Sequence, residues 1–329
     1  MSSVRLATDG WHWKEWGAEL AGTAVLLFAV VTAKYWAVRA GPPFSDPAIR
    51  VTIVGTVAGL VVVGVAFSPL GHRSGAHLNP AVTIGLWLQR VTGRADLAGY
   101  CAAQIIGGIA GVAAARAWGP QVADATVHWA VIAPAARINE ATAAAVEAGA
   151  TFAQLVLVFG VLASRRYHQW APVVAGVLLT TFIVALAPVS GAGFNPVRGL
   201  APDVLANVYP AIWIYFAGPV AGSAAAAAAV IAWGRRPVTG KLWHDPAISC
   251  HMRCALPHRP AASSRAYIAG RDSPLAATTR ASRELPTTTV APGLGHDPDP
   301  AGTNARGFLL AELQAGARIR GRLTGRNDS

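Results

Sequence analysis

The sequence predicts an all-α membrane protein in which six transmembrane helices and two half-helices form an inverted repeat. Three observations predict this fold class. First, 53% of the residues are apolar and only 13% are charged, whereas soluble domains average about 25% charged residues. Second, six apolar stretches are long enough to cross a bilayer. Third, two similar polar segments interrupt the apolar pattern at corresponding places in the two halves of the chain.

Each expected span meets the length requirement of about 20 residues, because a helix rises 1.5 Å per residue and the hydrocarbon core is roughly 30 Å thick. The six spans are residues 17–37, 51–70, 97–118, 143–163, 171–189 and 208–233. The first is too long and begins too far from the N-terminus for a signal peptide, so we expect it to be retained as a helix.

The basic residues indicate the orientation, because loops rich in Lys and Arg stay in the cytoplasm. If six helices alternate, one side receives Arg5, Lys14, Arg73, Arg90, Arg94, Arg165, Arg166, Arg235, Arg236 and Lys241. The opposite side receives fewer, chiefly Arg39, Arg50 and Arg137. Both termini are therefore expected to be cytoplasmic. The net charge of +11 follows this bias and a basic tail, so no nucleic-acid partner is expected.

Three regions follow from the composition along the chain: a cytoplasmic N-terminal segment (1–16), a membrane domain (17–236) and a tail (237–329). The tail is rich in Pro, Ser, Thr, Arg and Gly and has no sustained apolar period. Such a segment cannot bury enough apolar surface to offset its ordering entropy, so we expect it to be cytoplasmic and mostly disordered. The preference for Arg, Ala and Gly suggests GC-rich coding, and hence a bacterial inner (plasma) membrane.

The tail also contains residue types that bind zinc, namely His244, Cys250, His251, Cys254 and His258. Their spacing is irregular, whereas structural zinc sites use closely spaced ligand pairs. We therefore interpret them as part of a polar tail and expect neither a metal site nor a cofactor.

An internal repeat is indicated by three pairs of similar segments that occur in the same order. The pairs are residues 18–28 with 146–159, 74–83 with 190–199, and 107–115 with 218–226. The first pair places Glu19 and Glu147 early in an apolar helix. Each half, about 17–118 and 143–233, contains three spans. Because three is an odd number, the second half must cross the membrane upside down relative to the first.

The middle pair reads SGAHLNPAVT from residue 74 and SGAGFNPVRG from residue 190. Asn is a favoured helix N-cap and Pro a favoured first helical residue, so Asn79-Pro80 and Asn195-Pro196 are expected to start helices. The helix-compatible stretches, about 79–90 and 195–204, span only half the hydrocarbon thickness. They are therefore expected to be half-helices that begin in the middle of the membrane.

Two such helix starts that meet head to head concentrate positive potential, about half a charge each, and repel cations. We expect the side-chain amides of Asn79 and Asn195 to donate to the same passing oxygen, which orients a water so that it cannot relay protons. Irregular backbone at this depth must be buried or line a wet cavity, so His77 is also expected at the pore. Arg198 adds a fixed positive donor near one mouth.

On these signature segments, the early Glu of each half and the Gly-rich third and sixth helices, the chain resembles the aquaporin and aquaglyceroporin (major intrinsic protein) family over residues 15–236. The resemblance implies a passive channel, and not an enzyme, for water or neutral solutes of glycerol or urea size that excludes protons and ions. It also implies a homotetramer in the bilayer. Val197 departs from the second signature and is expected to change the packing beneath Asn195.

The resemblance also implies roles for individual residues. Glu19 and Glu147 would hold backbone groups of the signature loops, a structural role that they share with Pro80 and Pro196. By spacing, the selectivity filter falls on Gly59 (or Ala58 if the register shifts by one), Ile183, Ala192 and Arg198.

This ring lacks the bulky aromatic and the His of strict water channels, which implies a wider and less polar pore. Gly199 and the aromatic pair Tyr215 and Phe216 are closer to the water-channel pattern. The identity of the solute therefore stays open.

A secondary transporter is the alternative, because transporters also use inverted repeats and broken helices. It normally needs acidic or other polar residues that line a coupling-ion site, and apart from Glu19 and Glu147 we identify none within the spans. Flux that is linear in the gradient and independent of pH and sodium indicates a channel, whereas saturation and ion coupling indicate a carrier.

Overall fold

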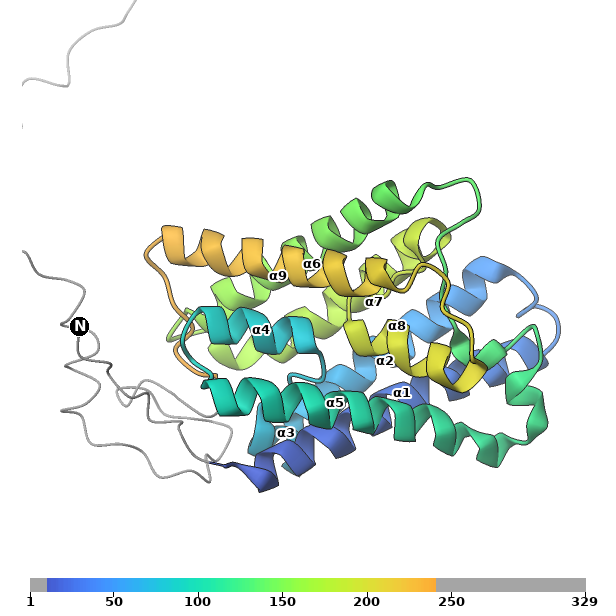
Figure 1. Ribbon diagram of the computed structural model, residues 1–329, viewed down its shortest axis with the longest axis horizontal. Coiled ribbons are helices and arrows are strands. Elements are labelled where there is room, and N and C mark those ends of the chain that lie inside the picture. Colours follow the sequence, from blue (N-terminus) through green and yellow to red (C-terminus); the bar gives the residue numbers. More distant parts are fainter. Residues whose placement is uncertain (1–10, 241–329) are drawn as a thin grey trace, which may run out of the picture. The chain divides into compact units, whose positions relative to one another are not determined.

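The computed structural model describes residues 11–240, and the regular elements of this part are helices (Figure 1). The long helices are α1 (Trp13–Arg39), α2 (Pro47–Phe67), α5 (Arg94–Ala114), α6 (Glu140–Leu162), α7 (Ala171–Ser190) and α9 (Trp213–Ala232). The shorter ones are α3 (Pro69–Ser74), α4 (Pro80–Leu88) and α8 (Pro196–Ala206). Short 3₁₀ turns are η1 (Ala115–Trp118), η2 (Pro120–Ala123), η3 (His128–Ala130) and η4 (His168–Trp170).

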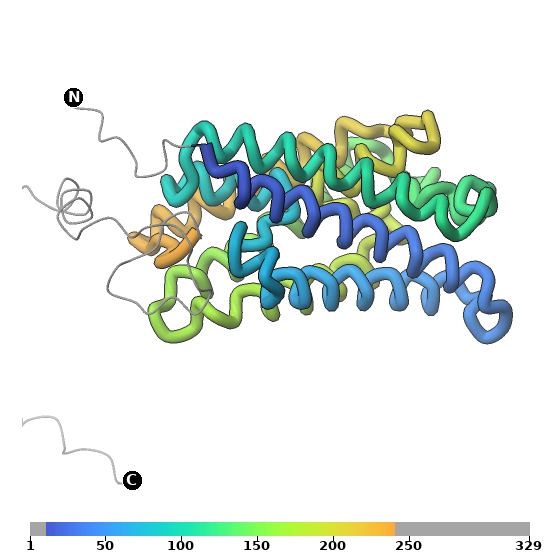
Figure 2. Tube along the Cα trace, turned by 90° about the horizontal axis from the view of Figure 1, so that it is seen from below, coloured from blue at the N-terminus to red at the C-terminus, as the bar shows by residue number. Residues whose placement is uncertain are grey.

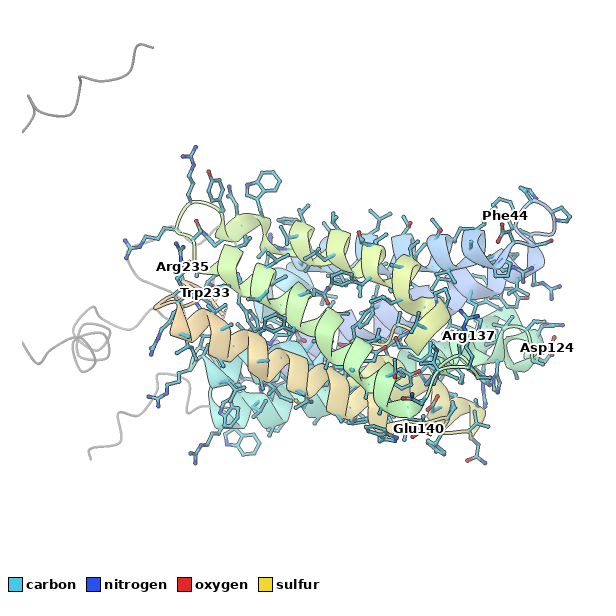
Figure 3. All side chains as sticks on the ribbon, turned by 90° about the horizontal axis from the view of Figure 1, so that it is seen from above. Phe44, Asp124, Arg137, Glu140, Trp233 and Arg235 are labelled. Atoms are coloured by element: carbon cyan, nitrogen blue, oxygen red, sulfur yellow. The ribbon has the colours of Figure 1, made fainter. Side chains whose placement is uncertain are left out.

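Six helical segments within residues 11–240 are long and apolar enough to cross a membrane, which confirms the six predicted spans. The observed boundaries differ from the predicted ones by a few residues, and two of the differences change which residues belong to a span. The second span ends at Phe67, because the Ser68 hydroxyl accepts from Leu70 N–H and so caps a separate helix, α3. The last span begins at Trp213 and not near residue 208. Polar side chains mark the two ends of the bundle: Figure 3 shows Arg235 at one end and Asp124 and Arg137 at the other.

The long helices run side by side along the bundle (Figures 1 and 2), and the two halves pack in the same way. Helix α1 packs on α5, as α6 packs on α9. Each half-helix packs on the third long helix of the other half, α4 on α9 and α8 on α5. The confirmed fold is thus a six-helix bundle whose two halves interlock through their half-helices.

Close helix contacts depend on glycine in the third long helix of each half. A Cβ on Gly107 would collide with the Leu20 carbonyl, and one on Gly111 with the Ala24 carbonyl. In the second half, Gly222 lies against the Ala148 carbonyl in the same manner. Small residues at such positions let helix backbones approach closely in membranes. The Gly-rich segments of the repeat therefore act in packing.

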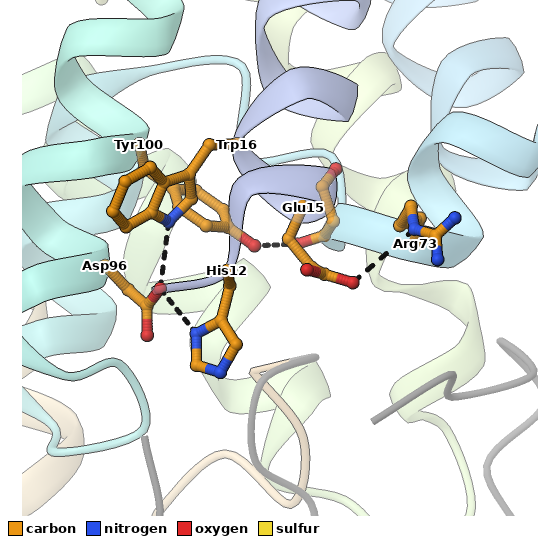
Figure 4. A network of polar contacts seen from close by, with 7 residues as sticks. His12, Glu15, Trp16, Arg73, Asp96 and Tyr100 are labelled. Carbon is orange, nitrogen blue, oxygen red and sulfur yellow. Dashed lines mark hydrogen bonds and ion pairs between the residues drawn. The ribbon is translucent and has the colours of Figure 1, made fainter. Parts of the chain in front are cut away.

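A polar network fastens the start of α1 to α5 (Figure 4). The Asp96 carboxylate accepts from Trp16 Nε1 at 2.9 Å, and its Oδ1 lies 2.8 Å from His12 Nδ1. The Tyr100 hydroxyl donates to the Ser74 carbonyl at 2.8 Å, which attaches α5 to the end of α3. The first two contacts thus join α1 to α5, and the third holds the helix that precedes the first signature loop.

The described part of the chain begins and ends at the same end of the bundle (Figures 1 and 2), as an even number of spans requires. After α9, Gly234 turns the chain with φ +66°. Val238 N–H then donates to the Leu162 carbonyl at 2.8 Å, and Val238 and Thr239 are buried. Val238 and Thr239, which the sequence analysis assigned to the tail, thus pack against the bundle. The remainder of the tail, including the five His and Cys residues considered above, lies outside the described residues.

Truncation after Trp243 is expected to preserve fold and flux, because the sequence beyond it is rich in Pro, Ser, Thr, Arg and Gly and has no sustained apolar period. Truncation after Arg235 is the matched control. It removes Val238, whose burial stabilises by about 1.5–3 kcal/mol, so it should lower the thermal stability of the detergent-solubilised protein. Thermal unfolding and proteoliposome flux measure both outcomes. Loss of folded protein in the Trp243 truncation would show that residues beyond it are needed.

Candidate functional site

The two half-helices begin at the asparagines of the signature segments. The Asn79 side-chain oxygen accepts from Ala81 N–H at 2.8 Å, and the Asn195 oxygen accepts from Val197 N–H at 2.9 Å. Pro80 and Pro196 occupy the first helical positions, where a missing N–H has no cost. Each half-helix thus starts as the local sequence predicts.

The amide groups of the same asparagines connect the two signature loops. Asn79 Nδ2 donates to the Phe194 carbonyl at 2.9 Å, and Asn195 Nδ2 donates to the Leu78 carbonyl at 2.9 Å. The sequence interpretation assigned these amides to a passing solute alone. A primary amide has two N–H donors, so the bond to the opposite loop uses only one of them.

The first signature loop is held by Glu19, which is fully buried. Its carboxylate accepts from His77 N–H at 2.9 Å, Leu78 N–H at 2.8 Å and Gln104 Nε2 at 2.7 Å. A carboxylate that is satisfied in this way fixes a backbone which would otherwise have unpaired donors at membrane depth. Gln104 escaped the sequence analysis because it reads as one polar residue in an apolar helix.

Glu147 performs the same function for the second loop and is also fully buried. It accepts from the Ser190 hydroxyl at 2.7 Å, Gly193 N–H at 2.9 Å and Phe194 N–H at 2.6 Å. Both loops contain non-glycine residues in the left-handed region: φ is 51° at Leu78 and at Phe194. This conformation costs about 1–2 kcal/mol per residue, which the bonds to the two glutamates offset.

A cavity of about 420 Å³ runs through the bundle past both asparagines. The expected pore residues that line it are His77, Asn79, Ile183, Ala192, Asn195 and Arg198. Its walls are otherwise mainly apolar side chains of α1, α2, α6 and α7. One part of the lining, which we call the cationic end, contains Lys34, Arg50 and Arg198. The opposite part, the histidine end, contains His77, His168, Thr239 and Gly240.

Of the two alternatives for the first filter position, Gly59 does not line the cavity. A Cβ at Gly59 would collide with the Gly176 carbonyl and the Thr180 hydroxyl of α7, so this residue serves helix packing. Its neighbour Ala58 lines the cavity. The structure therefore favours the register that places Ala58 at this position.

Arg198 is fixed by a backbone carbonyl beside the cavity. Its Nη1 donates to the Ala130 carbonyl at 2.8 Å, and Ala130 is buried in a turn whose residues have positive φ. Val197, the departure from the signature, packs its Cγ1 against Gly108 so closely that a Cβ there would collide with it. The larger side chain beneath Asn195 is therefore accommodated by a glycine in α5.

Several cavity residues were missed by the sequence analysis. Lys34 lies inside the first apolar span, and a charged residue at such a position is a functional signal by itself. Arg50 was assigned only to loop charge. At the histidine end, Thr239 and Gly240 line the cavity together with His77, a proximity of distant segments that no local pattern predicts.

The bundle, its two half-helices and the cavity through it define a membrane channel built on an inverted repeat. The comparison with known families agrees: the model of the family "Major intrinsic protein" matches residues 7–230, which is more than half of the chain. The chain therefore belongs to the major intrinsic protein family, whose members are passive channels for water and small neutral solutes.

Relatives and a solved structure support this assignment. The chain is 35% identical over 214 residues to Aquaporin NIP1-3 from Oryza sativa subsp. japonica, covering 64% of this chain and 70% of the relative. It is 33% identical over 210 residues to Aquaporin TIP4-4 from Zea mays, covering 62% and 80%. The fold matches the aquaglyceroporin from Plasmodium falciparum with a TM-score of 0.58 at 20% identity, covering 67% and 96%. These plant relatives give no support to a bacterial source.

Proposed function

We propose that the 420 Å³ cavity is the conducting pore, and that Asn79 and Asn195 form its centre. The single observation that carries this proposal is the pair of half-helix starts, with both asparagines capping a helix and facing the same cavity. A solute there meets two helix N-termini and the free amide hydrogens, which favour an oxygen acceptor and disfavour a cation.

We further propose that solutes of glycerol or urea size pass in addition to water. The filter then consists of Ala58, Ile183, Ala192 and Arg198. Two alanines and an isoleucine leave a ring that is wide and apolar on three sides, and Arg198 supplies the strong donor. A solute must therefore be neutral and must carry an oxygen that accepts from a guanidinium.

Channel conduction also requires flux that is linear in the gradient, whereas saturation with ion coupling would support the secondary transporter.

The placement of the protein in the cell is part of the same proposal. Both termini are cytoplasmic, because the loops at the Trp13 end hold the larger set of basic residues. The membrane is the plasma membrane, and the composition argues for a bacterial inner membrane. The resemblance suggests a homotetramer. Reporter fusions at each terminus test the orientation, and the mass of the protein in a native membrane-mimetic particle tests the assembly.

Narrowing the filter is expected to reverse the solute preference. Ala58→Phe together with Ile183→His adds bulk and a polar group, so it should reduce glycerol and urea flux by about tenfold or more, the effect of a barrier higher by about 1.4 kcal/mol. Water flux should persist. The measurement is stopped-flow light scattering on proteoliposomes. Leu60→Phe is the matched control, because Leu60 is 65% exposed on the same helix and should leave all three fluxes unchanged.

The proposal on solute size fails if the unmodified protein passes water freely and excludes glycerol and urea. Gly59→Phe is unsuitable for this test, because the ring would enter the contact between α2 and α7.

A further inference from the structure

The cationic end of the cavity brings three positive side chains together: Lys34 from α1, Arg50 from α2 and Arg198 from α8. Lys34 and Arg198 are close enough for their charges to interact. The residues that line the cavity within the described part of the chain include no Asp and no Glu. The solute path at this end is therefore lined by positive charge alone.

The hydrogen bonds that the two arginines make to the protein go to neutral backbone carbonyls. Arg198 donates to the Ala130 carbonyl, and Arg50 donates through Nε to the Phe44 carbonyl at 2.7 Å. Within residues 11–240 the structure shows no ion pair for any of the three cations, and it shows no hydrogen bond from the Lys34 ammonium to the protein.

Two carboxylates lie near Arg198 but do not neutralise the cavity. The carboxylates of Asp203 and Glu147 interact electrostatically with the guanidinium. Neither residue lines the cavity. Glu147 is occupied by Ser190 and the second loop. The carboxylate oxygens of Asp203 have no hydrogen-bond partner among the described residues, so they do not contact the guanidinium.

Partly buried charges are costly unless they are paired, and two like charges in a common cavity raise the cost further. A mobile anion from solvent removes this cost. A planar oxyanion suits the site, because a guanidinium presents parallel N–H donors to two oxygens while an ammonium pairs with it as a point charge.

We propose that the cationic end binds a small, planar, monovalent oxyanion, of the size of nitrate or formate, between the Lys34 ammonium and the Arg198 guanidinium. The inference rests on the proposed function, because the anion occupies the path of the neutral solute. Bound anion therefore reduces solute flux, and Lys34 is a residue that determines this anion sensitivity.

The test uses the full-length protein in proteoliposomes with equal concentrations of sodium nitrate, sodium formate or sodium gluconate. Gluconate is too large to enter the site. For each variant the readout is the ratio of glycerol flux in nitrate or formate to glycerol flux in gluconate, so differences in the amount of protein cancel. We expect this ratio to fall as nitrate rises, and we expect formate to act in the same way.

Lys34→Met should weaken the apparent nitrate affinity by about tenfold, as expected for loss of a hydrogen bond to a charged group. Lys34→Arg should retain most of it. Arg39→Met is the matched control: it removes a positive charge from the same end of α1, but Arg39 lies over the Tyr35 ring and does not line the cavity. This control should keep both the flux and the nitrate dependence.

Two results would overturn the inference: an equal flux of the unmodified protein in nitrate and gluconate, or a Lys34→Met variant with undiminished nitrate dependence. Glycerol flux in gluconate tests the proposed function separately. If the protein conducts no glycerol, thermal unfolding of the detergent-solubilised protein in nitrate and in gluconate tests whether the anion binds. An anion that binds the folded state raises its stability. Equal melting temperatures would then contradict the site.

Discussion

Replacing Asn195 or Asn79 by Leu is expected to stop conduction at the centre of the pore. Each change removes the donor that faces the solute, the bond to the opposite loop and the cap of a half-helix. Loss of the hydrogen bond to a desolvated solute, together with the displaced loop, raises the free-energy barrier to conduction by about 3 kcal/mol. This lowers flux by about 100-fold. Stopped-flow measurements of water and glycerol should then approach the rates of protein-free liposomes.

Two further variants distinguish an effect on conduction from an effect on stability. Asn139→Leu is the matched control, because Asn139 caps α6 with the same kind of bond, from Thr142 N–H at 2.8 Å, and does not line the cavity. It should lose some stability and keep its flux. Asn195→Asp retains the capping oxygen and loses the amide donor, so it should also fail to conduct. Unchanged flux in both Leu variants that are inserted and folded would disprove the pore assignment.

Replacing Glu147 by Leu is expected to have the largest effect on stability. The change leaves two backbone N–H groups and the Ser190 hydroxyl without an acceptor in a buried site. Each unsatisfied donor costs about 1–3 kcal/mol, so the total of several kcal/mol is comparable to the stability of a typical domain. We expect little folded protein in size-exclusion chromatography and a sharply lower melting temperature.

Glu140→Leu is the control for this variant, because Glu140 lies on the same helix and bonds the Trp213 indole at an exposed site. It should change the melting temperature little, since exposed contacts contribute weakly. Glu147→Gln should be intermediate, because the amide keeps one acceptor oxygen and turns the other position into a donor. A Glu147→Leu protein as stable as the Glu140→Leu protein would refute the structural role.

The parts of the structure that the sequence predicted are those set by local chemistry. Asn followed by Pro can start a helix without help from the rest of the chain, and both half-helices begin at these residues. Glu19 and Glu147 could be identified because a carboxylate in an apolar helix requires partners. Because the sequence repeat relates the two halves, the signature segment and the early Glu of one half supported the same interpretation of the corresponding residues in the other half.

The parts that were missed depend on distant contacts or on a change in register. The choice between Gly59 and Ala58 stayed open because spacing along the sequence does not fix the register of α2 against α7, whereas the structure places Ala58 at the cavity and Gly59 against the Gly176 carbonyl. The bonds from the asparagine amides join loops more than 100 residues apart. Lys34 was missed because a single Lys near the end of an apolar span is also compatible with an ammonium at the membrane interface, and only the fold places it at the cavity.

The reciprocal bonds from Asn79 to Phe194 and from Asn195 to Leu78 also constrain how the protein is made. The first loop has no partner for its amide until the second loop has been synthesised and inserted. Its half-helix α4 likewise packs on α9, the last long helix of the described chain. The contacts that complete the centre of the cavity therefore need segments from both halves of the chain. We expect this centre to form late in folding, after α9 has been synthesised.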